Sequence, residues 1–225
     1  MVMGISFGRG VFFHDRNVLA CAEVKRGVIH VWAEKITLQT IGKLWVRVCF
    51  SLPWYYHLFH LGLLGYLVAA WLDERLAVVN PWWLVVYLAG FHFVFPRQLK
   101  QFHGAEHKVF SHGGAKNLDA LEEIRRADIV NAGCSTNLVM YFFASFLLTL
   151  PFAGLEWGVA AGIVGTLLGM WGEKYLRRYA GLLYKASAFC QRHLTTKEPD
   201  RIHLETAIRS YQMFEHVRSR LSQAA

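Results

Sequence analysis

The sequence predicts a mainly α-helical integral membrane bundle of about four spans, with a small β-hairpin near its N-terminus. Composition is the first observation: 54% of the 225 residues are hydrophobic and 18% are charged, against about 25% in a typical soluble domain. The others are a series of long apolar runs and an uneven distribution of Lys and Arg between them. A net charge of +8 would also suit nucleic acid, but the apolar runs indicate a membrane lipid bilayer as the partner, and no nucleic acid is expected.

Residues 1–43 are expected to form a cytosolic segment built on the hairpin. Residues 18–24 (VLACAEV) and 28–34 (VIHVWAE) are rich in β-branched side chains. Gly27 lies between them and can adopt the positive φ that a tight turn requires. The chain opens with no early apolar core and no small-residue cleavage site, so we expect no secretory signal peptide.

Two apolar runs predict the first two spans of a membrane domain over residues 44–175. Residues 44–72 contain a single charge and exceed the roughly 20 residues that cross about 30 Å of hydrocarbon, with a kink expected at Pro53. Residues 76–95 are also apolar, but an internal Asn-Pro pair leaves a span of only 81–95.

Two further runs predict a tight helical hairpin in the membrane. They cover residues 138–153 and 157–172, and Pro151 and Gly154 divide them. Between the two pairs of runs lies a polar segment, residues 97–133, which is expected to be a cytosolic loop rich in ligand-type side chains.

The basic residues predict the orientation of these spans. Segments 1–47, 97–133 and 173–225 hold seven, six and ten Lys or Arg residues, whereas the two proposed outer loops hold only Arg75. Since basic loops stay on the cytoplasmic side, we expect a multi-pass protein of the inner (cytoplasmic) membrane with both termini in the cytosol.

Residues 176–225 are expected to form cytosolic helices. Asp200 is a candidate N-cap for the last of them. The apolar residues of that helix fall on one face, which would pack on the cytosolic part or lie at the membrane surface. They are Leu204, Ala207, Ile208, Tyr211, Phe214 and Leu221.

The residues after the second run predict a metal site. His103, Glu106 and His107 have the spacing H-x-x-E-H, and on a helix residues four apart lie on one face. The two histidines can therefore share a divalent metal ion, most naturally zinc, while the glutamate handles a proton of water as the catalytic residue. The motif is short, and a solvated helix face near a bilayer is the alternative interpretation.

A catalytic zinc site needs a third protein ligand and an open position. Cys134 is the preferred candidate, because it lies where the polar segment returns to the membrane; a small buried cysteine at a helix start is the alternative. The four cysteines show no CxxC spacing, so no disulfide framework is expected. Glu122 fits a capping box that begins at Asp119 better than it fits ligation, and His112 fits a surface position.

Three motifs resemble a known family. They are HGAEHK at 103–108, the region of Cys134, and QRHLTTKEP at 191–199. These blocks, with the opening segment 8–31, resemble the YqhQ-like bacterial family, a domain of unknown function, over nearly the whole chain. The resemblance implies a metal-dependent membrane protein. Thr195 and Thr196 are second-tier candidates, since two hydroxyls beside a lysine could bind phosphate, although a linker is the simpler interpretation.

The chain departs from that family at one place. The family reads His-Pro-Arg-Cys-Gly-Thr-Ser where residues 131–137 read Asn-Ala-Gly-Cys-Ser-Thr-Asn. Cys134 and Thr136 match, but Asn131 replaces the histidine. If that histidine is a metal ligand in the family, this chain has a weaker site, a different ligand set or a divergent role.

Two functions follow as hypotheses. The first is a metal-dependent integral membrane hydrolase that acts at the boundary between cytosol and membrane. The second is a non-catalytic membrane scaffold or regulatory factor that binds a protein partner. Histidines inside the apolar runs weakly suggest a third, a cation carrier. The sequence specifies neither the substrate nor the partner.

Overall fold

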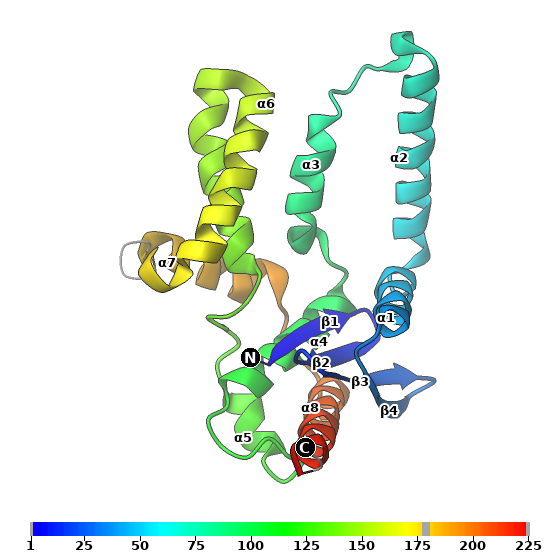
Figure 1. Ribbon diagram of the computed structural model, residues 1–225, viewed down its shortest axis with the longest axis vertical. Coiled ribbons are helices and arrows are strands. Elements are labelled where there is room, and N and C mark those ends of the chain that lie inside the picture. The colour runs from blue at the N-terminus through cyan, green and yellow to red at the C-terminus, as the bar shows by residue number, and fades with distance from the viewer. Residues whose placement is uncertain (1, 177–180, 224–225) are drawn as a thin grey trace. The chain divides into compact units, whose positions relative to one another are not determined.

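The computed structural model of the protein describes residues 2–176 and 181–223 and is mainly helical (Figure 1). Four strands come first, and they are β1 (Met3–Phe7), β2 (Gly10–His14), β3 (Val18–Lys25) and β4 (Val28–Lys35). The helices are α1 (Leu38–Phe50), α2 (Trp54–Leu72), α3 (Trp82–Ala89), α4 (Arg97–Ser111), α5 (Leu121–Arg126), α6 (Thr136–Leu176), α7 (Gly181–Cys190) and α8 (Arg201–Gln223). Three short helical turns, Glu74–Leu76, Phe91–Val94 and Gln191–Thr195, complete the described elements. Part of the predicted C-terminal segment 176–225, residues 177–180, lies outside the described residues.

The chain divides into two compact units. The sheet unit consists of Met1–Pro53, Pro96–Asn131 and Thr196–Ala225. The helical unit consists of Trp54–Phe95 and Ala132–Thr195. Each unit is therefore assembled from segments that are far apart in the sequence.

The strands form one antiparallel sheet in the order β1-β2-β3-β4. The predicted hairpin is confirmed as β3 and β4, in which Lys25 pairs with Val28. Arg26 and Gly27 form the turn with φ values of 51° and 80°, as the favoured two-residue hairpin turns require. The hairpin is half of the sheet, because β1 and β2 extend it on the side of β3.

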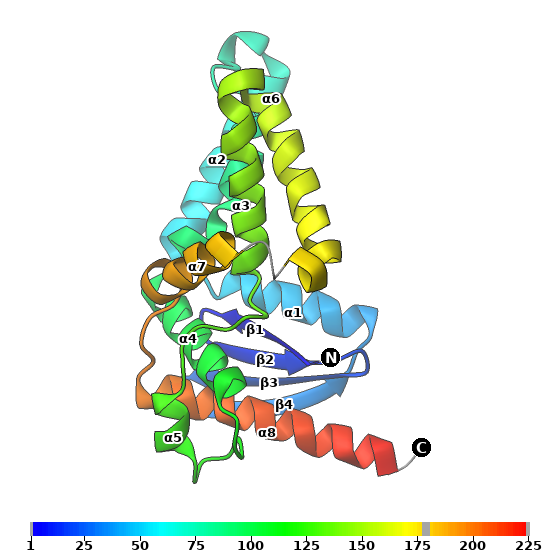
Figure 2. The same ribbon diagram turned by 90° about the vertical axis from the view of Figure 1, so that its left-hand side faces the viewer.

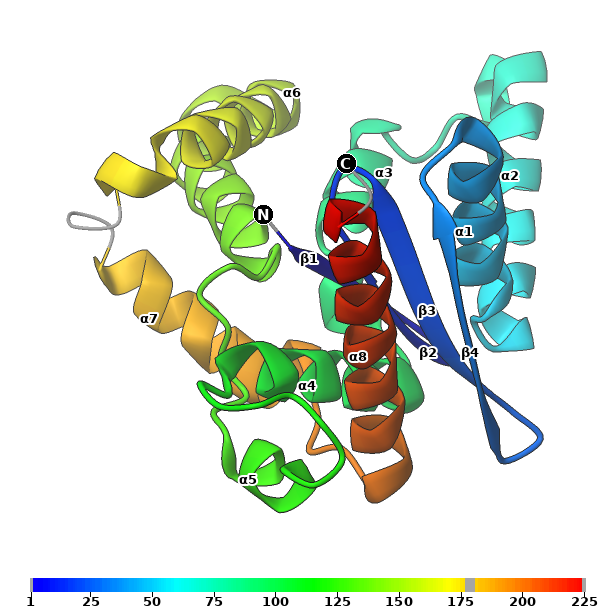
Figure 3. The ribbon, with the colours of Figure 1, turned by 60° about the horizontal axis from the view of Figure 1, so that its bottom comes forward.

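Helices cover both faces of the sheet (Figures 2 and 3). On one face, alternate strand residues such as Phe13 and Ala20 pack against α4, α5 and α8. On the other face, Phe12 and Cys21 form a second core with Leu44 of α1. Because side chains alternate along a strand, two covered faces leave nearly every residue of β2 and β3 buried.

The last helix behaves as predicted. Four of the six predicted apolar positions, Leu204, Ala207, Ile208 and Phe214, have no exposed surface. The other two, Tyr211 and Leu221, are partly buried and pack against the same core. Asp200 immediately precedes the helix, and its carbonyl accepts hydrogen bonds from the amides of His203 and Leu204. Ser210 donates to the carbonyls of Val11 and Ala20, so α8 is also tied to the backbone of the sheet.

The prediction of one helix over residues 44–72 is wrong. The chain breaks at 51–53, since Pro53 disfavours helical geometry in the residue before it. Helix α1 ends at Phe50, and the Ser51 hydroxyl accepts a hydrogen bond from the amide of Gly8 at 2.9 Å. The first part of this apolar run therefore belongs to the sheet unit.

The prediction of a span over residues 76–95 is also corrected. Helix α3 has only 8 residues, about 12 Å, and Gly90 separates it from a 3₁₀ turn. Neither piece alone crosses about 30 Å of hydrocarbon. In α2, by contrast, all 19 residues are helical and none is buried, although its side chains are mostly apolar.

The predicted helical hairpin is confirmed within α6. Gly154 has φ 81° and ψ −177°, which reverses the chain between two helical arms (Figure 2). Small residues let the arms approach closely: a Cβ at Gly162 would lie 2.7 Å from the ring of Phe142. Gly158 faces Phe146 and Gly169 faces Tyr141 in the same way. The stripe of glycines on the second arm is therefore a packing surface for aromatic rings of the first.

Among the described residues, one helical segment, Thr136–Gly172, is long and apolar enough to cross a membrane. Only 17% of its most apolar window is buried, unlike the core helix of a soluble protein. This indicates membrane association in a general sense, and the four-span bundle stays a prediction. The predicted loop 97–133 is largely helical, because it contains α4 and α5.

Substituting Gly162 tests the packing of the hairpin. Gly162→Leu would overpack the contact with Phe142 and destabilise the protein by about 1–3 kcal/mol. We expect the apparent melting temperature in detergent to fall by on the order of 5 °C. Size-exclusion chromatography of samples heated to a series of temperatures measures it. Gly65→Leu is the matched control, because nothing described lies within 4 Å of a Cβ at that position. Equal effects of the two substitutions would contradict the packing role.

Candidate metal centre

Helix α4 carries the H-x-x-E-H motif in a buried position. Every residue from Gln101 to Val109 is buried, although the stretch is rich in polar side chains. The helix packs against β1, β2, α5 and α8. Glycine is required at position 104, where α4 lies against the backbone of Lys197, because a Cβ there would collide with the Lys197 carbonyl. The solvated helix face considered as the alternative is therefore wrong for these residues.

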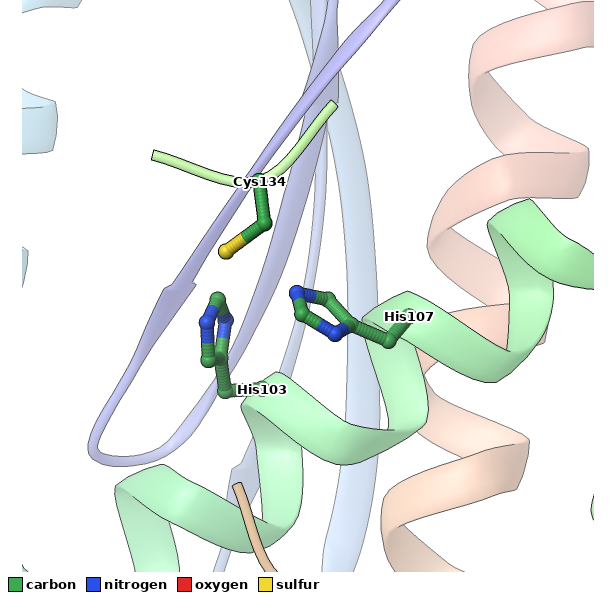
Figure 4. Close-up of side chains that lie close together, drawn as sticks. All are labelled: His103, His107 and Cys134. Atoms are coloured by element: carbon green, nitrogen blue, oxygen red, sulfur yellow. The ribbon is translucent and has the colours of Figure 1, made fainter. Parts of the chain in front are cut away.

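The two histidines of the motif and Cys134 lie together, with their side chains directed toward one another (Figure 4). The ring centroids of His103 and His107 are 4.3 Å apart. The three candidate ligand atoms, one from each residue, all lie within 4.8 Å of one another. His103 and Cys134 are each 7% exposed and His107 is 1% exposed. This buried group could hold a metal ion.

Each histidine has its Nδ1 atom next to an acceptor. Nδ1 of His107 lies 2.6 Å from the carbonyl oxygen of Ile129, so it carries the proton and donates. Nδ1 of His103 lies 3.5 Å from Oε2 of Glu106. Metal-binding histidines in proteins are commonly held in this way by a carbonyl or a carboxylate, which fixes the tautomer with Nε2 as the ligand atom.

The second ring nitrogen of His107 is the most informative atom of the site. Its Nε2 is buried and, among the residues that the structure describes, has no hydrogen-bond partner. Because Nδ1 carries the proton, Nε2 offers a lone pair. Leaving such a group unpaired costs about 1–3 kcal/mol, so a cation beside it would remove a real penalty.

Glu106 is held between the motif and strand β1. Its carboxylate accepts a hydrogen bond from the hydroxyl of Ser6. Gly4 leaves room for it, because a Cβ at that position would collide with the carboxylate. Burial by itself raises the pKa of Glu106, but the hydrogen bonds from His103 and from the Ser6 hydroxyl act in the opposite direction, and the pKa of this carboxyl lies below its usual range. Glu106 is therefore a carboxylate at neutral pH.

Cys134 is positioned by the start of α6. The amide of Thr136 donates to its Sγ at 3.4 Å, and the thiol in turn donates to the Thr136 hydroxyl oxygen at 3.2 Å. The following Asn137 donates to the carbonyl of Ala132 at 2.6 Å and accepts from the hydroxyl of Ser187 at 2.6 Å. These contacts fix the loop that carries the thiol.

The donor set fits a metal ion of the zinc type. Two imidazole nitrogens and one thiolate are borderline-soft ligands, and they number three, as in catalytic zinc sites. Tetrahedral bonds of about 2.0–2.3 Å place ligand atoms roughly 3.3–3.8 Å apart. Separations within 4.8 Å therefore require a contraction of at most about 1.5 Å on binding.

The other predicted residues do not belong to this group. Glu122 is exposed and pairs with Arg125 at 3.6 Å. The predicted capping box is wrong, because α5 begins at Leu121 and the Asn117 side chain accepts from the amide of Ala120 instead. His112 ends α4, 3.9 Å from Glu123.

Three further candidates, Asn131, Thr195 and Thr196, also lie outside the His–His–Cys group. Asn131 is half-buried in the loop before Cys134. Thr195 and Thr196 have no exposed surface, and the hydroxyl of Thr195 lies 3.5 Å from that of Thr136. A surface phosphate site made by these two hydroxyls is therefore not what the structure presents.

Sequence reasoning missed the residues that support the site. Ser6 and Gly4 are about 100 positions from Glu106, and no local pattern connects them. Lys108, which closes the HGAEHK motif, also has a role that the motif does not predict. It is buried, and its ammonium donates to the carbonyls of Arg125 at 2.6 Å and Ala127 at 3.1 Å and pairs with Glu198 at 2.9 Å. A lysine directly after the motif and before the apolar pair Val109-Phe110 was the available signal.

Substituting Gly4 tests whether the position of the Glu106 carboxylate supports metal binding. Gly4→Ala would push the carboxylate of Glu106 away from His103 and Ser6, and loss of such outer contacts typically lowers metal affinity 10- to 100-fold. We expect the apparent zinc affinity, measured by competition with a chromophoric chelator, to fall by roughly 10-fold. Gly42→Ala, in open space on α1, is the control and should leave affinity unchanged. An unchanged affinity in Gly4→Ala would contradict the role of Glu106 in orienting the ligand His103.

Comparison with known proteins places this site in a family. No curated protein and no solved structure matches the chain. A family model described as "Protein of unknown function (DUF1385)" matches residues 74–216, which include the whole candidate metal centre. The match covers more than half of the chain, and the chain therefore belongs to this family of proteins of unknown function.

Proposed function

We propose that this protein is a membrane metalloprotein that binds one divalent ion, zinc by the chemistry of its ligands, and acts as a hydrolase at the boundary between cytosol and membrane. The observation that carries the proposal is the buried, unpartnered Nε2 of His107 among the described residues, within a group that includes His103 and Cys134. A polar atom in that position needs a partner, and the neighbouring side chains are those that bind metals.

The reaction class follows from the number of ligands. Three protein ligands leave one position of a tetrahedral ion for water or substrate, which is typical of catalytic zinc and not of structural zinc. Bound zinc would supply Lewis acidity to this position. Peptide, ester and amide bonds are all substrates of that class.

The chain's own residues supply the proton chemistry. Glu106 holds the Nδ1 proton of His103 and is a carboxylate at neutral pH, so it can accept a proton as well as orient the ring. Ser6 donates to the same carboxylate and limits its motion. Glu106 is therefore proposed both as a positioning group for His103 and as the catalytic acid–base.

The proposal includes the topology expected from the sequence. The α6 hairpin and the exposed apolar helix α2 support a multi-pass arrangement. The clustering of Lys and Arg in three segments supports cytosolic termini. The resemblance to the YqhQ-like family, which rests on the sequence motifs, belongs to the same proposal.

Metal content is the direct test. The protein purified in detergent should contain about one divalent ion per chain by elemental analysis. His107→Ala and Cys134→Ala should each lose most of it, because each removes one of three ligands. His112→Ala and Cys190→Ala remove the same side-chain types outside the group and should retain the ion.

Two results would refute the metal proposal. One is a parent protein that stays free of metal after incubation with zinc, cobalt and manganese salts. The other is full stoichiometry in all four variants, with each variant shown to be monodisperse. Either result would leave the His–His–Cys group as a packing feature.

A second function is favoured by one observation. Glu106 is already engaged by Ser6 and His103, and all three ligand residues are buried, as in a closed structural site. A metal that only stabilises the fold would suit a scaffold or regulatory factor that binds a protein partner. The substitution of Asn131 for the histidine expected from the family resemblance agrees with this alternative.

Cobalt substitution separates the two functions. In the Co²⁺-loaded protein, an open coordination position should let azide change the visible d–d spectrum, whereas a closed site should not respond. We expect a saturable spectral change in the parent and in Glu106→Gln, since that substitution keeps the ligands. No response to azide would favour the structural ion, and loss of cobalt from Glu106→Gln would show that the carboxylate is needed mainly to hold the ligand His103.

A further inference from the structure

Helix α1 has one broad apolar face that the sheet covers only in part. One side of this face, with the half-buried Leu44, packs against the sheet beside the buried Thr40. The other side carries Leu38 and Trp45, which are 89% and 67% exposed. A helix of a soluble unit normally buries its apolar side chains, so these exposed ones indicate an apolar environment beyond the protein.

An apolar groove runs beside this helix. Its volume is about 400 Å³, within the range of roughly 300–1,000 Å³ that small-molecule sites occupy. It lies entirely within the sheet unit, between α1 and strand residues of the sheet. The apolar residues that line it are Ile5, Leu19, Ile36, Ile41, Leu44 and Trp45.

One cation is available at this groove. Arg16 lines it and is exposed, and in the described part of the chain it forms no ion pair. The neighbouring Asp15 is already committed: its Oδ1 accepts from the amides of Asn17 and Val18, and its Oδ2 lies 3.8 Å from Arg218. The groove therefore combines an apolar interior with an unpaired positive charge on its lining.

The chain next to the groove indicates the source of the ligand. Three residues separate α1 from the exposed apolar helix α2, which begins with Trp54 and Tyr55. Tryptophan and tyrosine are enriched at the level of lipid headgroups. Trp45 on α1 is a third such ring. The exposed Trp45 beside the groove and the aromatic residues that follow in the sequence favour a lipid over a soluble metabolite as the ligand.

We propose that this groove binds an anionic phospholipid, with an acyl chain between α1 and the sheet and the headgroup phosphate at Arg16. The apolar residues contribute by burial and the guanidinium by a charge-assisted contact with phosphate. The site is separate from the metal centre, so either can fail without the other.

Photolabelling tests the proposal on the full-length protein in mild detergent. The probe is phosphatidylglycerol with a photoreactive acyl chain, compared with phosphatidylcholine that carries the same chain. We expect label on the peptides of α1, several-fold more with phosphatidylglycerol. Arg16→Gln should lower phosphatidylglycerol labelling about fivefold, to the level of phosphatidylcholine, as the loss of one basic contact predicts. Arg209→Gln, an exposed arginine of α8 outside the groove, is the charge-matched control.

A second pair of variants tests the groove itself. Ile41→Glu places a charge in the wall at a residue that is 47% exposed, so the fold should tolerate it, and labelling with both lipids should be lost. Leu38→Glu, on the same helix but not in the lining, should retain it. Equal labelling by the two lipids with no effect of Arg16→Gln would overturn the proposal. So would label confined to α2 and α6, or α1-dependent dimers detected by light scattering. Metal content should stay at the parental level in all four variants.

Discussion

The burial of a polar helix is the constraint on which the sheet unit depends. Helix α4 places Gln101, His103, Glu106, His107 and Lys108 in the interior, where each donor and acceptor must find a partner or impose a cost. The neighbouring segments are arranged to supply those partners. Lys108 alone has three, which matches the three donors of an ammonium group.

The partners come from all three segments of the unit. Ser6 of β1 binds Glu106, the carbonyl of Ile129 binds His107, and Asp200 accepts from the side chain of Gln101 at 3.0 Å. A polar network that is fully satisfied selects one arrangement of its surroundings, because any other leaves a buried group unpaired. In the described part of the chain, Nε2 of His107 is one of four buried side-chain nitrogens without a hydrogen-bond partner, and it is the one that lies among metal-binding side chains, which points to a partner of a different kind.

The sequence predicted what depends on local spacing. His103 and His107 lie on one helical face because they are four residues apart, and the β3–β4 turn needs Gly27 for its positive φ. The α6 hairpin was foreseen because Pro151 and Gly154 interrupt an otherwise continuous apolar run. Cys134 was included for its place at the return to an apolar segment, and its proximity to the histidines is a contact that no local rule requires.

The failures have a common physical origin. Hydropathy reports how apolar a segment is and not what covers it, so the apolar residues of α1, which face a sheet core, were read as part of a span. Glu106 was assigned from the motif alone, whereas its environment is set by Ser6 and Gly4, about 100 residues away. Strands β1 and β2 are short and separated by only Gly8-Arg9, which weakens the alternation that identifies strands.

The order of the segments has a consequence for biosynthesis. The strands are translated well before α8, although α8 covers much of one face of the sheet. Phe13 and its neighbours therefore stay only partly covered while the intervening apolar helices are translated. The sheet unit can close over this face only once α8 has been made, so until then these apolar residues are open to contact with a chaperone.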